Sequence, residues 1–328
     1  MTSISIIIPI FNVESYISRC LYSVTSQTYK GPTECILVDD CGTDNSITMA
    51  EDIINKYQGP IRFRIIKHKF NRGLAAARNT GMNAAISEYI YFMDSDDEIC
   101  PNCIENLAQS LTEEQYDLVI GDVRTIGDNT LNTFLRLKLP DGMILKNDDI
   151  VLNYRNNWNM MAQNKLYNVA FIRQHQLIFK EGIIHEDELW SYEIACLART
   201  LKVVKSAIYI YYIRKDSITA NSNQNLNIKI QNLLIIISDM TQFLLSQKIV
   251  SVHAYLIIQK FIEDILQIKK TNRQDFKCTY FFIREETKFP FRYRVKIYCN
   301  NIRLLFSEIH YLLPISIGEK YKYWRITK

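Results

Sequence analysis

Three aspartates stand close together in Asp94-Ser95-Asp96-Asp97, directly after the apolar run 89–93. Carboxylates are costly to place at the end of a buried segment unless something pairs with them. In an extended segment the side chains of Asp94 and Asp96 point to the same side. Two close carboxylates repel each other unless a cation lies between them, and hard oxygen ligands suit Mg²⁺ or Mn²⁺. The pattern therefore favours a divalent metal site on Asp94 and Asp96.

Asp97 has a simpler explanation. It precedes Pro101, and proline favours the first position of a helix. A carboxylate just before a helix caps its N-terminus and complements the helix dipole. Capping explains one carboxylate well and three badly, so we expect Asp97 to cap a helix over 101–111.

A second acidic cluster, Glu186-Asp187-Glu188, precedes a predicted helix that reaches about Leu201. Spacing alone favours carboxylates that complement the positive end of this helix, with a general base as the alternative. The segment from His185 lacks the second histidine of H-E-x-x-H, so a zinc protease site is not indicated.

The first 125 residues alternate between short apolar runs and segments with helical spacing of apolar residues. This alternation predicts a doubly wound, mostly parallel α/β sheet. The expected strands are 5–9, 35–39, 63–67, 89–93 and 117–121, and the expected helices are 16–24, 47–57, 74–86 and 101–111. Since ligands bind where parallel strands end, we expect the polar residues after these strands to converge. They are Asn12, Asp39, Asp40 and Asp94 to Asp97.

The rest of the chain is less regular. Residues 129–180 are polar and predict irregular structure, followed by the helix to about Leu201, a strand over 203–213 and two helices over 225–268. We expect a domain over 1–220, with a nucleotide-binding half (1–125) and an acceptor-binding half (126–220). A helical, basic region over 221–328 follows it.

Composition excludes several classes of protein. With 48% hydrophobic and 23% charged residues in 328, the chain is typical of soluble globular proteins. The apolar segment 1–11 lacks a basic region and predicts a buried strand, not a signal peptide, and no apolar run reaches transmembrane length. The eight cysteines have no disulfide or zinc spacing, which predicts reduced thiols and a cytoplasmic protein. No glycine-rich phosphate loop occurs, so a dinucleotide-binding dehydrogenase or a P-loop enzyme is not indicated.

Charge is unevenly distributed along the chain. Residues 269–328 hold 14 Lys/Arg and 5 Asp/Glu, a net charge of +9, whereas residues 1–268 have a net charge of −5. A basic, aromatic tail suggests contact with an anionic membrane surface, with a packed helical appendage as the alternative. No nucleic-acid-binding motif accompanies it, so we expect no nucleic acid partner.

Four motifs in fixed order resemble family 2 glycosyltransferases of the GT-A fold. They are Ile6–Asn12, Val38–Ser46, Asn71–Gly81 and Tyr91–Asp97, and the likeness continues through 164–167, 185–187 and 211–218. It covers about two thirds of the chain.

The resemblance implies a nucleotide site. Pro9, Phe11 and Asp40 would hold a uracil-type base, Asp39 would lie nearby on the nucleoside, and Arg78 would face the diphosphate. Without the resemblance, Arg78 is more simply a solvated helix residue and Asp40 a turn residue.

The resemblance also implies the chemistry. Asp94 would contact the ribose or the metal, with Ser95 beside it, Asp96 would ligate Mn²⁺ or Mg²⁺, and Asp187 would be the catalytic base. Trp190 and Tyr192 would either stack on the acceptor sugar or pack in the core.

The implied activity is transfer of a hexose or N-acetylhexosamine from a UDP-sugar to a hydroxyl of a saccharide or lipid-linked oligosaccharide. One base without a protein nucleophile implies inversion. We expect this reaction in cell-surface polysaccharide synthesis, at the inner face of the cell membrane. The alternatives are a sugar nucleotidyltransferase and a non-catalytic nucleotide-sugar-binding protein.

Overall fold

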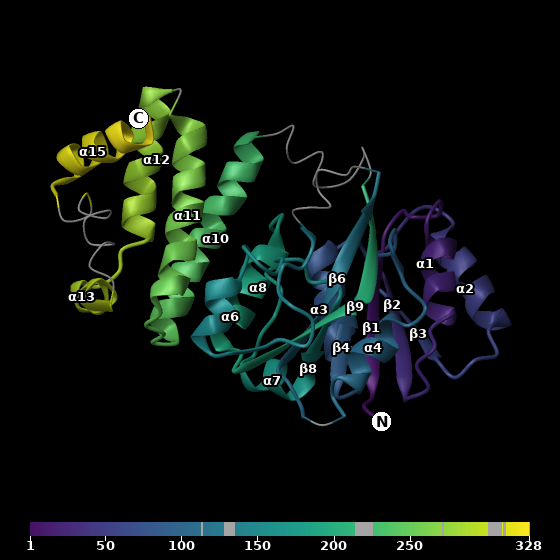
Figure 1. Ribbon diagram of the computed structural model, residues 1–328. Coiled ribbons are helices and arrows are strands. Elements are labelled where there is room, and N and C mark those ends of the chain that lie inside the picture. The colour runs from purple at the N-terminus through teal and green to yellow at the C-terminus, as the bar shows by residue number, and fades with distance from the viewer. Residues whose placement is uncertain are drawn as a thin grey trace. The chain divides into compact units, whose positions relative to one another are not determined.

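The computed structural model describes residues 1–112, 114–127, 135–213, 226–270, 272–300, 310 and 313–327. The chain divides into two compact units, Met1–Ala220 and Asn221–Lys328 (Figure 1). The first unit contains a sheet with helices packed on it, and the described part of the second unit is helical.

Nine strands in the described residues form one sheet in the order β3-β2-β1-β4-β8-β6-β9-β5, with β7 paired to β9. β1, β2, β3 and β4 run parallel to one another, and β6 runs parallel to β9. β8 lies antiparallel between β4 and β6. The predicted class, an α/β fold with a mostly parallel sheet, is confirmed. The strands are β1 (Ile4–Ile10), β2 (Thr33–Asp39), β3 (Arg62–Lys67), β4 (Tyr89–Phe92), β5 (Glu98–Ile99), β6 (Leu118–Ile126), β7 (Ile144–Lys146), β8 (Lys165–Asn168) and β9 (Thr200–Tyr212).

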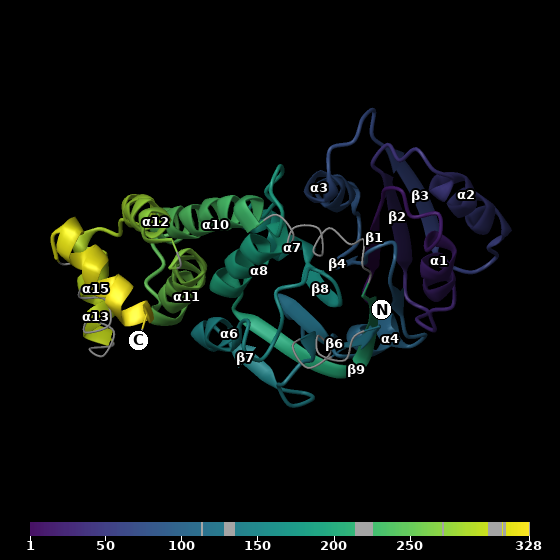
Figure 2. The same ribbon diagram turned by 90° about the horizontal axis from the view of Figure 1, so that it is seen from above.

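Helices cover both faces of β1 and β2. Figure 2 shows α1 (Ile17–Thr25) and α2 (Ser46–Lys56) on one face and α3 (Leu74–Ala84) on the other. All seven residues of β1 are buried, because alternate side chains enter the two opposite cores. On the α3 side, Gly81 lets the helix approach β1 so closely that an added Cβ would lie 2.3 Å from Ile7 Cγ2. This close contact sets the position of α3 relative to the strand ends.

The expectation of irregular structure over 129–180 is wrong for the part described. It contains β7, α6 (Asp148–Asn153), β8 and α7 (Val169–Gln174). These elements are only three to six residues long, so they give little periodicity. β8 also begins with the buried Lys165, whose ammonium donates to the Asn159 side chain and to carbonyls of the preceding loop.

Several predicted boundaries are shifted. The helix expected from Pro101 to Leu111 is α4 (Cys103–Gln109), with Asn102 as its N-cap residue and Pro101 in the turn before it. α8 (Glu186–Leu197) begins at the acidic cluster itself, so the three carboxylates occupy its first turn. The strand predicted over 117–121 extends to Ile126.

The C-terminal unit contains α10 (Leu226–Ser246), α11 (Val252–Lys269), α12 (Arg273–Glu286), α13 (Phe291–Asn300) and α15 (Ile315–Thr327). α10 and α11 are the two helices predicted over 225–268, and α12 packs against both. In the described residues α10 alone is long and apolar enough to span a membrane, although the sequence suggested no such run. This is a weak indication, because 44% of its most apolar window is buried in the chain. Within the basic tail 269–328, residues 301–309 lie outside the described residues.

Candidate active site

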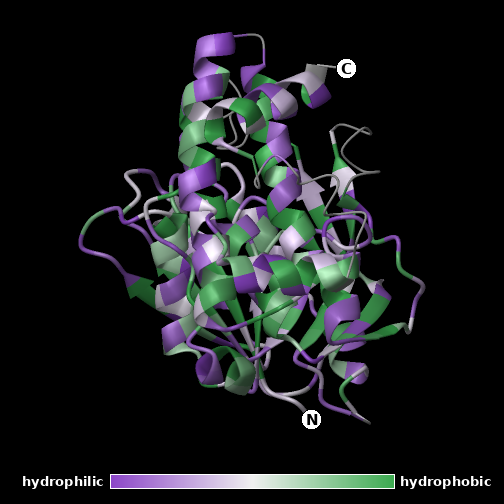
Figure 3. Ribbon diagram, turned by 90° about the vertical axis from the view of Figure 1, so that its left-hand side faces the viewer, coloured by the Kyte–Doolittle hydropathy of each residue, from purple (hydrophilic) through white to green (hydrophobic). Residues whose placement is uncertain are grey.

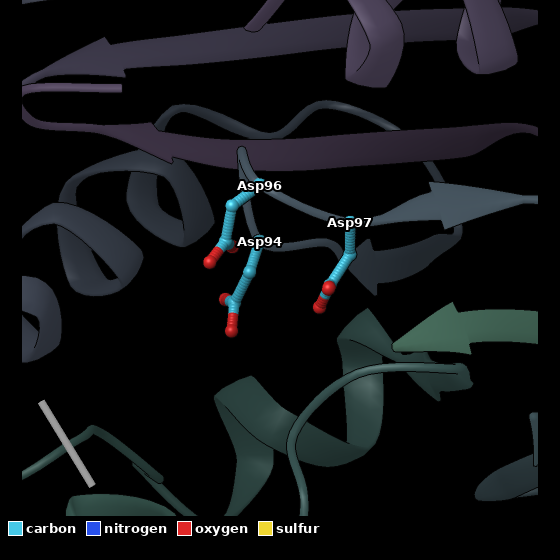
Figure 4. Close-up of side chains that lie close together, drawn as sticks. All are labelled: Asp94, Asp96 and Asp97. Carbon is cyan, nitrogen blue, oxygen red and sulfur yellow. The ribbon is translucent and has the colours of Figure 1, made fainter. Parts of the chain in front are cut away.

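The Asp94–Asp97 loop joins β4 to β5 at the end of the parallel strands. Ligand oxygens of Asp94, Asp96 and Asp97 all lie within 4.8 Å of one another. Figure 4 shows the carboxylates of Asp94 and Asp96 side by side, projecting in the same direction. The loop therefore brings together the pair of carboxylates expected from the sequence.

Asp94 is held at both carboxylate oxygens. Arg78 Nη2 donates to Oδ1 at 2.9 Å, and Gln163 Nε2 donates to Oδ2. Arg78 comes from α3 and Gln163 from the loop before β8, so two separate elements fix the orientation of Asp94.

Asp97 does not cap a helix, contrary to the expectation. It is 1% exposed and accepts hydrogen bonds from Tyr209 Oη at 2.7 Å and from the Tyr212 amide at 2.9 Å. Burial, together with the nearby charges of Asp96 and Asp94, raises its pKa well above the usual range for a carboxyl. Tyr209 also accepts from the Asp94 amide at 3.1 Å, so β9 supports the whole loop.

Arg19 of α1 braces the same loop from the other side. It donates to the Asp96 carbonyl at 2.6 Å, pairs with Glu98 at 3.1 Å and stacks 3.5 Å from the centre of the Tyr212 ring. Sequence reasoning missed this residue, because a single arginine in an amphipathic helix gives no local signal.

The convergence of strand-end residues is largely as predicted. A cavity of about 390 Å³ is bordered by Pro9 and Phe11 of the β1 end, by Asp40 of the β2 end, and by Asp94, Ser95 and Asp96. Asn12 lies beside it, holding the loop after β2 through a 2.8 Å bond from the Thr43 amide. Asp39 does not border the cavity, and its Oδ1 accepts from the Cys41 amide at 3.0 Å.

Asp40 is buried and organises the turn into α3. Its carboxylate accepts from the amides of Arg72 and Gly73 at 2.8 and 2.7 Å, and lies 2.6 Å from His68 Nδ1. Gly73 has a φ of 87°, a conformation that favours glycine. Asp40 is thus a structural acceptor for its own chain as well as part of the cavity wall.

Arg78 is neither solvated nor part of the wall of this cavity. It is 2% exposed, and its two terminal nitrogens donate to Asp94 and to Glu186. Burial disfavours its charge, but Asp94, Glu186 and Asp187 outweigh that effect and hold its pKa above the usual range.

A second cavity of about 450 Å³ contains the proposed base. Asp187 lines it together with Arg78, Gln163 and Glu188, and no hydrogen bond to the Asp187 carboxylate occurs within the described residues. Burial raises the pKa of Asp187 to about 8, with Glu186 and Glu188 adding to the rise and Arg78 opposing it. A carboxylate of this kind is a stronger base than an exposed one.

The two cavities adjoin, because Leu74, Asp94 and Tyr211 line both. Tyr211 is half-buried at the end of β9. Sequence reasoning predicted the strand over 203–213 but did not identify Tyr211 as a site residue.

Trp190 and Tyr192 do not line the second cavity. They are 1% and 0% exposed, and Trp190 stacks on Phe179 with the ring centres 4.2 Å apart. Of the two alternatives, packing in the core is the correct one.

The model of glycosyl transferase family 2 matches residues 5–186, more than half of the chain. The chain is 30% identical over 225 residues to glycosyltransferase GlyA of Streptococcus pneumoniae and 32% identical over 230 residues to the putative glycosyltransferase EpsH of Bacillus subtilis. These alignments cover 66% and 68% of this chain, but only 31% of GlyA and 64% of EpsH.

A third relative is the poly(ribitol-phosphate) β-N-acetylglucosaminyltransferase TarP of Staphylococcus aureus. It is 28% identical over 229 residues, which cover 69% of this chain and 67% of TarP. The solved structure of S. aureus TarS 1–349 in complex with UDP-GlcNAc superimposes with a TM-score of 0.70 at 18% identity. The superposition covers 99% of this chain and 90% of the TarS chain, which confirms a fold of the GT-A type.

Proposed function

Because the chain belongs to glycosyl transferase family 2, we propose that it moves a hexose or an N-acetylhexosamine from a UDP-sugar onto a hydroxyl group. The acceptor is a saccharide or a lipid-linked oligosaccharide in cell-surface polysaccharide synthesis. The relative TarP, a poly(ribitol-phosphate) β-N-acetylglucosaminyltransferase, supports this class of reaction.

One observation carries the proposal: the cavity bordered by the ends of β1, β2 and β4 adjoins a second cavity that is lined by the carboxyl group of Asp187. The first holds Phe11 and Asp96, the second holds Asp187, and Asp94 and Tyr211 line both. A donor in the first cavity would present its anomeric carbon where the two meet. An acceptor hydroxyl in the second would approach that carbon beside Asp187.

A divalent cation fits the residues of the Asp94–Asp97 loop. Three carboxylates within 4.8 Å repel one another, and a hard cation relieves that repulsion. Burial and, after it, the charges of Asp96 and Asp94 raise the pKa of Asp97. Asp96 would be the main ligand, as the resemblance to family 2 glycosyltransferases implies, with the neighbouring carboxylate of Asp94 beside it. When bound, Mn²⁺ or Mg²⁺ would neutralise charge on the leaving diphosphate.

The chain's own residues supply the rest of the reaction. The Asp187 carboxylate takes the proton of the acceptor hydroxyl as the hydroxyl oxygen attacks the anomeric carbon. The bond from that carbon to the diphosphate oxygen breaks, and UDP leaves. A single displacement without a protein nucleophile inverts the anomeric configuration. Arg78 and Gln163 hold Asp94 in place beside the donor.

The nucleoside end belongs to Pro9, Phe11, Asp39 and Asp40 in this proposal. Phe11 is 44% exposed at the cavity, which suits packing against a base. Asp40 has donors from its own chain on both oxygens and can accept at most one more bond, which the ring N–H of the base would donate. Asp39, which does not border the cavity, would lie nearby on the nucleoside.

We also propose that the C-terminal unit contacts an anionic membrane face, where lipid-linked acceptors reside. Its helices expose Phe281, Phe282, Phe291, Ile317 and Trp324 among basic residues. Figure 3 shows hydrophilic and hydrophobic residues interspersed along these helices. Basic charge and exposed aromatic rings together suit an anionic membrane surface.

A panel of nucleotide sugars tests the function. The purified protein is incubated with each UDP-sugar, with Mn²⁺ or with EDTA, and thermal unfolding and UDP release are measured. We expect metal-dependent stabilisation and UDP release with at least one UDP-sugar. No stabilisation by UDP or by any UDP-sugar in Mn²⁺ would refute the proposal.

A further inference from the structure

Arg78 joins two parts of the site that come from distant segments. From α3, Nη2 donates to Asp94 at 2.9 Å and Nη1 donates to Glu186 at 2.6 Å. Asp94 follows β4 beside the nucleotide cavity, and Glu186 is the first residue of α8. The next residue of α8 is the proposed base, Asp187.

The surroundings of Arg78 leave it little freedom to bind a donor. It is 2% exposed, and its guanidinium lies 5.4 Å from the centre of the Phe179 ring. Moving Nη1 to a phosphate would leave the buried Glu186 carboxylate without its partner, which is costly. Arg78 also lines the second cavity and not the nucleotide cavity.

The two carboxylates depend on Arg78 to different degrees. Asp94 keeps a second support in Gln163, whereas the Glu186 side chain has only Arg78 as a hydrogen-bond or ion-pair partner within the described residues. The first turn of α8 is therefore the part of the site that depends most on this arginine.

We propose that Arg78 is a positioning residue that fixes Asp187 relative to the donor, and that it does not bind the diphosphate. The inference rests on the proposed function. Through Glu186, Arg78 holds the first turn of α8 and hence the base. Through Asp94, it fixes the position of that turn relative to the nucleotide cavity. A displacement of about 1 Å at such a base costs roughly 10²-fold in rate.

Arg78→Lys tests the proposal, because one ammonium keeps the charge but cannot bridge two carboxylates as a planar guanidinium does. We expect kcat for UDP release to fall roughly 10- to 100-fold, with the donor KM little changed. The affinities for UDP and for uridine, measured by calorimetry in Mn²⁺, should change by the same factor. If Arg78 instead bound the diphosphate of the donor, Arg78→Lys would weaken UDP binding tenfold or more and leave uridine binding unchanged.

Glu186→Gln tests the same link from the other end. It should lower kcat in a similar way, and the double variant should be no slower than Arg78→Lys alone, since both changes break one connection. Additive losses would overturn the proposal. If Arg78→Lys fails to fold, Glu186→Gln decides the question: a loss of kcat at unchanged donor KM supports positioning, and an unchanged kcat overturns it.

Arg64→Lys is the matched control. Arg64 also donates to a buried carboxylate, Glu34, at 3.1 Å, but it lines neither cavity, so kcat should stay at the wild-type value. An unchanged kcat in folded Arg78→Lys would overturn the proposal. A wild-type protein that binds no UDP in Mn²⁺ would instead refute the proposed function, before any variant is compared.

Discussion

Replacing Asp187 by asparagine keeps the shape of the side chain and removes its basicity. We expect sugar transfer to fall about 10²–10⁴-fold, the usual effect of losing a general base. Affinity for UDP should remain, because Asp187 lines the second cavity and not the nucleotide cavity.

The pH dependence of the wild-type enzyme follows from the same carboxyl group. Burial raises the pKa of Asp187 to about 8, and a base acts in its deprotonated form. We therefore expect kcat/KM to rise with pH up to about 8 and to level off above it. The residual activity of Asp187→Asn should lack this rise.

The effect of Asp187→Asn on the stability of the protein should have opposite signs for a buried base and for a helix cap. A carboxyl whose pKa rises from 3.8 to about 8 on folding contributes stability that is complete below pH 3.8 and is lost as the pH rises through 8. At pH 8.5 the buried charge destabilises the fold by up to about 5 kcal/mol, and Asp187→Asn removes that cost. A carboxylate that only complements the dipole of α8 would stabilise it by about 0.3–1 kcal/mol, so its loss would destabilise the chain.

The assay combines UDP release with urea unfolding at pH 6 and pH 8.5. Asp149→Asn serves as the control, because Asp149 is an exposed carboxylate in the first turn of α6 and lines neither cavity. Asp187 is only a helix cap if the Asp187→Asn protein is less stable than wild type at pH 8.5 and keeps its turnover per folded molecule. That result would refute the base role.

Three further predictions concern the metal, the nucleotide and the C-terminal unit. Asp96→Ala should fold but lose Mn²⁺-dependent UDP binding in calorimetry, and undiminished wild-type activity in excess EDTA would contradict a metal role. Asp40→Asn places a donor against backbone N–H groups, so it should lower the free energy of unfolding by about 1–3 kcal/mol and also weaken UDP binding. Asp39→Asn should weaken UDP binding alone. An Asp40→Asn variant as stable as wild type would contradict this. The intact protein should sediment with anionic vesicles, less so as salt rises and less so for Phe291→Ser, and equal binding to neutral vesicles would contradict membrane contact.

The sequence predicted the nucleotide-binding half well, because its signals are local. β1, β2 and β4 are buried apolar runs followed by polar residues, and parallel topology alone brings Asp40 and Asp96 to one edge. The family motifs identified the same residues independently.

The acceptor half could not be predicted in the same way, because its elements depend on tertiary partners. β8 is four residues long and carries a buried lysine that local propensity would not place in a strand. Asp97 has the same sequence context as a helix cap, and only Tyr209 and Tyr212, more than 110 residues away, give it another role. Arg78 is similar, since its partner Glu186 is 108 residues distant.

The central claim is a metal-dependent, inverting transfer of a sugar from UDP. It is tested most directly by NMR of the product formed from the UDP-sugar that the enzyme turns over, with the anomeric coupling compared between donor and product. We predict UDP as the second product and an inverted anomeric configuration, both abolished in Asp187→Asn. Retention of configuration would contradict the single displacement at Asp187, and release of pyrophosphate in place of UDP would make the protein a nucleotidyltransferase.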